Sequence, residues 1–171
     1  MEDAMKRIIS VILALFTALC LCACEDTANM GELTEYQNRD FTAEVKLFIE
    51  GKEYAGTLQG RGGALILRVN EPQELCAFTF TLTESGAQIC VGDMRLPIKN
   101  TELLKFSRLF PLFSLPVSDT WHINRARPGG VDVYVCENDN VTLYVDAGSR
   151  LPLKIVSGST EVDVISFRMG E

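Results

Sequence analysis

Three cysteines, at positions 20, 22 and 24, mark the junction where an apolar run of the chain gives way to polar sequence. A thiol at such a junction can be a small buried residue, one half of a disulfide, a metal ligand or an attachment point for another group. These roles require different surroundings and different compartments. The residues on either side of the junction therefore help to decide between them.

The sequence before the junction has the order of a secretory signal peptide. Lys6 and Arg7 precede sixteen uncharged residues, 8–23, that end in a small residue. A basic start, an apolar centre and a small last residue are typical of a cleaved signal. The apolar stretch is shorter than the roughly 20 residues of a spanning helix, and an uncleaved anchor helix is the alternative. Acidic residues follow Met1, which is unusual in a signal, so the start of translation stays open between Met1 and Met5.

The four residues Leu21-Cys22-Ala23-Cys24 resemble the lipobox of bacterial lipoproteins, which has a leucine three positions before the cysteine and a small residue directly before it. The resemblance implies that the Cys24 thiol receives a diacylglycerol and that cleavage makes Cys24 the first residue of the mature chain. It also implies a lipid-anchored protein on the extracytoplasmic face of the cell membrane. Cys22 departs from the pattern, since other small residues are commoner there. A secreted protein with a fortuitous cysteine is the alternative.

No catalytic site is expected from the remaining polar residues. His122 is the single histidine, and Ser118 and Asp119 precede it closely. Hydrolysis by such a triad needs a strained nucleophile turn and an oxyanion hole, and the sequence contains no G-x-S-x-G. We therefore interpret His122 as a strand residue beside Trp121.

Three further cysteines, Cys76, Cys90 and Cys136, follow the junction. An odd number cannot pair fully within one chain, and the absence of C-x-x-C together with a single histidine argues against a zinc site. The strand pattern places Cys76 on the inner face of a sheet and Cys90 on the outer face. We expect all three to be small, mostly reduced residues, with no metal and no cofactor bound.

Length and composition indicate one folded domain. The chain has 171 residues, 47% of them apolar, and a formal net charge of −7. This length fits a single core of ordinary size, and the negative charge argues against a nucleic-acid partner. We expect a signal peptide at 1–23, a flexible polar tether at 24–40 and a β domain at 41–171.

Turn residues divide the domain into alternating strands. We expect two-residue hairpin loops at Gly51-Lys52, Arg61-Gly62, Ser85-Gly86 and Gly92-Asp93, and a three-residue loop at 138–140. These loops pair Leu47 with Gly56, Leu58 with Leu65, Phe80 with Val91, Val91 with Met94 and Val135 with Leu143. The alternation then places apolar side chains on one face of the sheet, which is typical of an antiparallel sheet with one solvated side. The residues expected on this face are Val45, Leu47, Ile49, Tyr54, Leu58, Leu65, Leu67, Val69, Phe78, Phe80, Leu82, Ile89, Val91, Met94 and Leu96.

A helix after the sixth strand is expected to cover this face. Leu103, Phe106, Leu109 and Phe110 fall at helical spacing, and Pro111 is expected to limit the far end. Strand patterns resume after it, which gives about eleven strands with one inserted helix.

This arrangement resembles the LolA/LolB-like lipoprotein fold, also seen in LppX-type lipoproteins of mycobacteria. The resemblance covers residues 41–171 and is carried by FTAEVKLFIEGKEYAGTL, NEPQELCAFTFTL and DAGSRLPLKI. It implies a mainly β (α+β) fold, in which an unclosed antiparallel barrel of about eleven strands cups a helical plug. The chain lacks LolA's long helix before the first strand and LolB's exposed apolar loop. It is therefore more similar to small LolA-like lipoproteins of single-membrane bacteria.

The resemblance also implies a ligand. It suggests a membrane-anchored lipoprotein that binds a lipid, an acyl chain or another apolar ligand between sheet and plug, without catalysis. The alternative is a structural or interaction lipoprotein of the envelope that uses the same fold as a rigid platform with no ligand. The ligand would be lined by residues of the inner face and the plug, namely Leu47, Tyr54, Gly56, Leu67, Phe78, Phe80, Leu103, Phe106 and Phe110. Gly56 leaves room on this face, either for a ligand or for a close approach of the plug.

Overall fold

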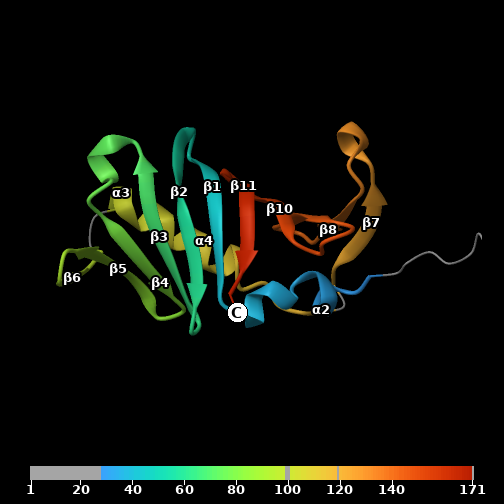
Figure 1. The fold of residues 1–171 in the computed structure, drawn as a ribbon, viewed down its shortest axis with the longest axis horizontal. Coiled ribbons are helices and arrows are strands. Elements are labelled where there is room, and N and C mark those ends of the chain that lie inside the picture. The colour runs from blue at the N-terminus through green and yellow to red at the C-terminus, as the bar shows by residue number, and fades with distance from the viewer. Residues whose placement is uncertain (1–27, 99–100, 119, 171) are drawn as a thin grey trace, which may run out of the picture.

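The computed structural model describes residues 28–98, 101–118 and 120–170. The predicted signal peptide and the lipidation site Cys24 lie outside these ranges. The described chain forms one antiparallel sheet with short helical segments against it (Figure 1). Within these ranges no helix has the length and apolar content needed to cross a bilayer.

The sheet has eleven strands in the order β6-β5-β4-β3-β2-β1-β11-β10-β9-β8-β7. Neighbours in sequence pair as hairpins, and the first and last strands pair with each other in the middle, so β6 and β7 remain as open edges. The predicted fold class, an unclosed antiparallel half-barrel of about eleven strands with a helical plug, is confirmed. The strands are β1 (Phe41–Ile49), β2 (Lys52–Arg61), β3 (Ala64–Glu71), β4 (Thr79–Thr83), β5 (Gly86–Val91), β6 (Met94–Pro97), β7 (His122–Ala126), β8 (Val133–Glu137), β9 (Thr142–Asp146), β10 (Pro152–Ser157) and β11 (Thr160–Met169).

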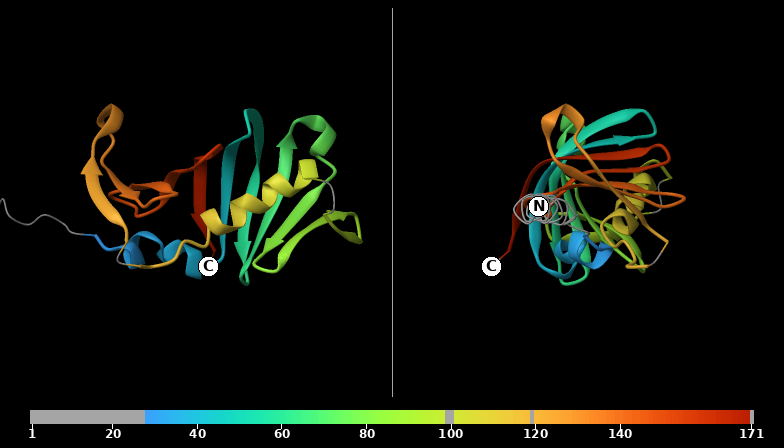
Figure 2. Two further views of the ribbon diagram at one scale, coloured as in Figure 1. Left: turned by 180° about the vertical axis from the view of Figure 1, so that it is seen from behind. Right: turned by 90° about the vertical axis from the view of Figure 1, so that its right-hand side faces the viewer.

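The plug is a helical segment, residues 101–112, that runs across β1 to β5 on the concave side of the sheet (Figure 2). It consists of α3 (Thr101–Leu104), a 3₁₀ turn η3 (Lys105–Arg108) and α4 (Leu109–Leu112). Phe106 and Leu109 are fully buried, as their helical spacing predicts. The prediction that Pro111 limits the helix was wrong by one residue. The 3₁₀ turn places Pro111 in the first turn of α4, where a missing N–H is tolerated.

The predicted flexible tether is wrong over residues 28–40. Residues before β1 form α2 (Met30–Leu33) and η1 (Glu35–Asn38), which pack against the same side of the sheet as the plug. Leu33 and Tyr36 are 0% and 2% exposed. The Asn29 side chain caps α2 by accepting a hydrogen bond from the Glu32 N–H at 3.1 Å. Met30, Leu33 and Tyr36 are spaced by three, which aligns them along one side of a tight helical segment.

Three predicted hairpin loops are displaced by one residue. The turns lie at Glu50-Gly51, Gly62-Gly63 and 84–85, and only the 92–93 turn is placed as predicted. Gly62 and Gly63 have φ values of 55° and 76°, as a type I′ turn requires at both central positions. Moving a loop by one residue shifts the pairing by two and leaves every side chain on its expected face. The observed pairs are Leu47 with Tyr54, Gly56 with Val69, Leu58 with Leu67, Phe80 with Ile89 and Val91 with Met94.

The β8–β9 loop has four residues, not the three predicted, so Cys136 and not Val135 lies opposite Leu143. The Asn138 side-chain oxygen accepts hydrogen bonds from the N–H groups of Asn140 and Val141 at 3.0 and 2.8 Å. This local turn lengthens the loop. A loop that is longer by one residue shifts the pairing by one, and this exchanges the side chains that face the core. Cys136 is therefore fully buried.

Two expectations for the inner face were wrong at the margins of the sheet. Cys76 lies outside the strands, after the 3₁₀ turn η2 (Gln73–Leu75), where it is exposed and its thiol donates to the Asn70 carbonyl oxygen at 2.8 Å. Met94 and Leu96 are 62% and 55% exposed on the edge strand β6. Both residues alternate as predicted, but the plug does not extend far enough to bury this edge of the sheet.

Candidate ligand-binding site

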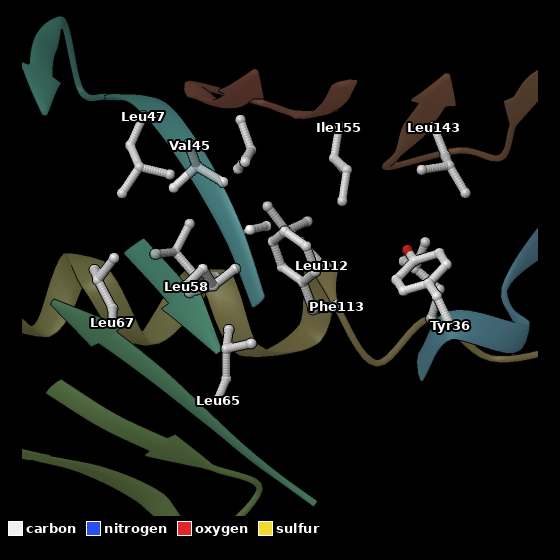
Figure 3. Close-up of a cluster of buried hydrophobic side chains, with 14 of the residues drawn as sticks. Tyr36, Val45, Leu47, Leu58, Leu65, Leu67, Leu112, Phe113, Leu143 and Ile155 are labelled. Atoms are coloured by element: carbon white, nitrogen blue, oxygen red, sulfur yellow. The ribbon is translucent and has the colours of Figure 1, made fainter. Parts of the chain in front are cut away.

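The structure brings together the aromatic residues that were expected to line a ligand. The Phe106 ring of the plug lies 5.2 Å from the Tyr54 ring and 4.6 Å from the Phe80 ring, measured between centroids. Leu47, Leu58 and Leu67 point from β1, β2 and β3 toward the plug (Figure 3). The interface between sheet and plug is thus a packed apolar layer.

The predicted site residues differ in how far their side chains are buried. Leu47, Leu67, Phe80 and Phe106 have no exposed surface and Tyr54 is 5% exposed. Phe78, Leu103 and Phe110 are partly buried and pack against the same core. In this closed arrangement most of the predicted site residues fill the space between sheet and plug with their own side chains.

Gly56 leaves space for the neighbouring strand of the sheet. An added Cβ would lie 2.5 Å from the Arg68 carbonyl oxygen of β3. The β2–β3 pairing shifts register between Ala55 and Gly56, so the two backbones approach closely there. The close packing of β2 against β3 therefore accounts for a glycine at position 56.

Two grooves flank the second half of the plug. Groove 1, of about 670 Å³, lies between the plug and the β4–β5 hairpin. Groove 2, of about 460 Å³, lies between the plug and the turns at 140–141 and 157–160. Both volumes fall in the range of ligand sites. Pro111 lines both grooves, whereas Phe110 is the one predicted site residue that lines either of them, in groove 1.

Lys105 is a candidate residue that the sequence reasoning missed. Its side chain is 8% exposed, and its ammonium lies 5.0 Å from the centre of the Tyr54 ring and 3.5 Å from the Glu102 carboxylate. Burial disfavours its charge, but Tyr54 and Glu102 outweigh this effect and raise the pKa of Lys105. A charged amine therefore stands at the margin of the apolar layer. Its position depends on the 3₁₀ turn, which an α-helical pattern does not indicate.

Few described groups are arranged for covalent chemistry. Ser118 shares a hydrogen bond with Thr120 at 2.8 Å, and Asp119 lies outside the described residues. In the described ranges no three His, Cys, Asp or Glu residues are grouped to hold a metal ion. Cys76, Cys90 and Cys136 are free thiols. Burial raises the pKa of the Cys136 thiol to about 11, so this thiol stays protonated at neutral pH.

Comparisons with known proteins relate the chain to others through its fold. No protein-family model matches the sequence, and no curated protein sequence matches it either. An uncharacterised conserved protein of Thermus thermophilus shares the fold with a TM-score of 0.53 at 12% identity, over 83% of this chain and 85% of that one. At this identity the likeness concerns the fold alone.

Two other solved structures are similar at lower scores. One is the complex of MucA with MucB from Pseudomonas aeruginosa, with a TM-score of 0.46 at 14% identity, over 83% of this chain and 56% of the matched chain. The other is a LolA superfamily protein from Nitrosomonas europaea, with a TM-score of 0.40 at 9% identity, over 85% of this chain and 95% of that one. The chain thus spans little more than half of the matched chain in the Pseudomonas complex.

Proposed function

We propose that this protein is a membrane-anchored extracytoplasmic lipoprotein that binds a lipid or other apolar ligand between its sheet and its plug, and that no covalent bond of the ligand changes. The observation that supports ligand binding is the apolar layer formed by Tyr54, Phe80 and Phe106, with a groove on each side of the plug. The anchor is supported by the lipobox that ends in Cys24.

In this proposal the ligand replaces the plug side chains. Exposing the buried apolar plug residues Phe106, Leu109 and Leu112 costs about 1.5–3 kcal/mol for each side chain. An acyl chain returns about 0.8 kcal/mol per buried methylene. Roughly six to eleven methylenes therefore balance the exposure of the plug. Ordinary fatty acyl chains are long enough to stabilise an open state.

Lys105 gives the proposed site a preference for ligands with an anionic head group. Its ammonium already lies next to the Tyr54 ring at the margin of the apolar layer. An anionic head group at the margin of the site would pair with this ammonium, and such a charge-assisted pair is stronger than a hydrogen bond to a neutral head group. We therefore propose fatty acids and acidic lipids as the preferred ligands.

Native mass spectrometry after mild detergent extraction tests ligand binding. We expect a co-purified lipid on the wild-type chain, and uptake of a fluorescent fatty acid by the delipidated chain. Lys105→Met should weaken uptake of the fatty acid but not of its methyl ester, and Lys52→Met, at an exposed lysine, is the matched control. Recovery of no lipid together with no uptake of either probe would exclude the ligand-binding role.

Cys24→Ser tests the anchor separately. We expect the wild-type N-terminal peptide to carry acyl groups by mass spectrometry and the protein to fractionate with membranes. The variant should lose both properties, because one thiol provides the attachment. Membrane association that is unchanged in Cys24→Ser would exclude this anchor.

The filled interior favours a second function, that of an envelope lipoprotein whose domain is a rigid platform for a protein partner. Phe80 and Phe106 have no exposed surface, and the layer between sheet and plug is already packed. Cross-linking in intact membranes distinguishes the two functions. A specific cross-linked protein, with no lipid recovered from the domain, would support the platform.

A further inference from the structure

We infer that the domain is held with its α2 end against the lipid bilayer and its β6 edge directed away from it. The inference rests on the proposed lipidation of Cys24. Three residues separate Cys24 from Ala28, and Ala28 is 9% exposed within the core cluster. Four peptide steps span at most about 14 Å when fully extended. The lipid anchor therefore leaves Ala28 little freedom to move away from the membrane surface.

The segment that follows Ala28 transmits this restraint to the whole domain. Leu33 is fully buried, and the Thr34 hydroxyl donates to the Met30 carbonyl oxygen at 2.6 Å. The Tyr36 ring lies 6.1 Å from the Phe41 ring of β1 and 5.6 Å from the Phe167 ring of β11. Because β1 and β11 pair in the middle of the sheet, α2 and η1 form part of the rigid body. A flexible segment at 24–40 would have a root-mean-square reach of about 20–25 Å and would leave the orientation free.

The position of α2 along the molecule then sets the orientation. In Figure 1 the chain enters the described fold at the end that carries β7 and α2, while β5 and β6 lie at the opposite end of the long axis. The reverse view in Figure 2 shows the same arrangement. A short connection at one end turns that end toward the bilayer and places the edge strand β6 farthest from it.

The surface near the anchor indicates how the contact is maintained. Glu32, Glu35 and Asp40 are exposed in residues 28–40, against one exposed cation, Arg39, and a segment with this net negative charge does not attract anionic lipids. The covalent connection, and not charge, therefore holds the α2 end at the membrane. The contact should persist at high salt, where the attraction of a basic patch would be screened.

Fluorescence quenching by nitroxide-labelled head groups tests this orientation. The full lipid-modified chain is reconstituted in vesicles of phosphatidylcholine and phosphatidylglycerol, in a Cys76→Ser, Cys90→Ser background. One fluorophore is attached through Glu35→Cys and, in a second sample, through Arg95→Cys; both positions are exposed. We expect loss of fluorescence at position 35, unchanged by high salt, and fluorescence at position 95 close to that without quencher. The background variant without either new cysteine measures stray labelling.

A longer connection provides the matched control. Twenty Gly-Ser residues inserted between Thr27 and Ala28 add a root-mean-square reach of about 25 Å, and the quenching at position 35 should fall toward the value at position 95. Equal quenching at both positions in the short chain, with the protein still floating with the vesicles, would overturn the orientation alone. Failure to float would overturn the anchor and the orientation together.

Discussion

The two halves of the sheet are held in different ways. The half formed by β1 to β5 is covered by the plug through apolar contacts, of which those of Phe106 with Tyr54 and Phe80 are the closest between rings. Ion pairs occur in both halves. On the plug they lie at the surface, where Arg108 pairs with Glu50 at 2.8 Å and Glu102 with Lys52 at 3.7 Å. In the half formed by β7 to β11 they link the two strands of a hairpin. Asp132 binds Arg125 and Arg127 at 3.1 and 2.9 Å, and Lys154 pairs with both Glu161 and Asp163.

This difference shows which half can open. Exposed ion pairs add little energy, but they fix the geometry of the β7–β8 and β10–β11 hairpins. Apolar contacts have no preferred direction, so an acyl chain can replace them. The ion pairs of the plug with Glu50 and Lys52 are exposed, and exchanging them for water costs little. We therefore expect a ligand to displace the plug from β1 to β5 while β7 to β11 keep their arrangement.

Truncation of the plug should have the largest effect. Phe106→Ala is expected to lower the free energy of unfolding by about 3–5 kcal/mol, because it removes a fully buried ring and leaves a cavity. Phe110→Ala, at a half-buried position of the same plug, should cost less. Urea denaturation measures both. A loss below about 1 kcal/mol for Phe106→Ala would show that the plug does not stabilise its half of the sheet.

Truncation of the N-terminal segment tests whether it belongs to the second half. Leu33→Ala should cost about 2–5 kcal/mol, since this side chain is fully buried. Glu35→Ala, two residues away and exposed, should stay within about 0.5 kcal/mol of the wild type. The same denaturation experiment compares them. Two equal, small changes would restore the flexible tether that the sequence predicts.

A methyl group at Gly56 tests the close approach of β2 and β3. Gly56→Ala is expected to cost about 1–3 kcal/mol, because the new Cβ would press against the Arg68 carbonyl oxygen. Gly148→Ala is the control, since its nearest neighbour would be 3.4 Å away. Thermal unfolding compares the variants. A neutral Gly56→Ala that gains ligand affinity would instead indicate that the space belongs to the ligand.

The smallest effect on stability is expected at acidic pH, in the half formed by β7 to β11. The N–H and hydroxyl of Ser149 and the N–H of Gly148 donate to the Asp146 carboxylate and hold its pKa below the ordinary value. A lowered pKa in the folded chain stabilises the fold above about pH 4, and this contribution falls as the pH drops through the folded pKa. Asp146→Asn should therefore flatten the dependence of stability on pH, by less than about 1 kcal/mol. Denaturation at a series of acidic pH values measures it, and an unchanged slope would contradict it.

The sequence predicts the faces of the sheet better than its pairing. Alternation places Leu47, Leu58 and Phe80 inside, and all three are buried. Alternation has a period of two, so it cannot distinguish pairings that differ by two residues, and this is the displacement found at three hairpins. At the β2–β3 turn the adjacent glycines Gly62 and Gly63, both with positive φ, carry the missing information. The β1–β2 turn instead begins with Glu50, at a φ of 53°, which its residue type does not indicate.

The candidate site was predictable where it depends on apolar spacing. Tyr54, Phe80 and Phe106 follow from strand alternation and helical spacing, and they meet in the structure. The position of Lys105 depends on a 3₁₀ turn within the plug. The packing of 28–38 depends on a sheet that brings β1 beside β11. Such contacts arise from tertiary structure, and a local pattern in a polar segment does not reveal them.

The open edges of the sheet bear on how copies of this chain coexist. An edge strand exposes unpaired backbone groups that another chain can extend into an aggregate. Here β6 has four residues and ends at Pro97, which has no N–H to donate. The other edge, β7, has five residues and exposes His122 and Arg125. Short strands, a proline and charge make both edges poor templates, so a half-barrel can stay unclosed even where many copies are crowded together.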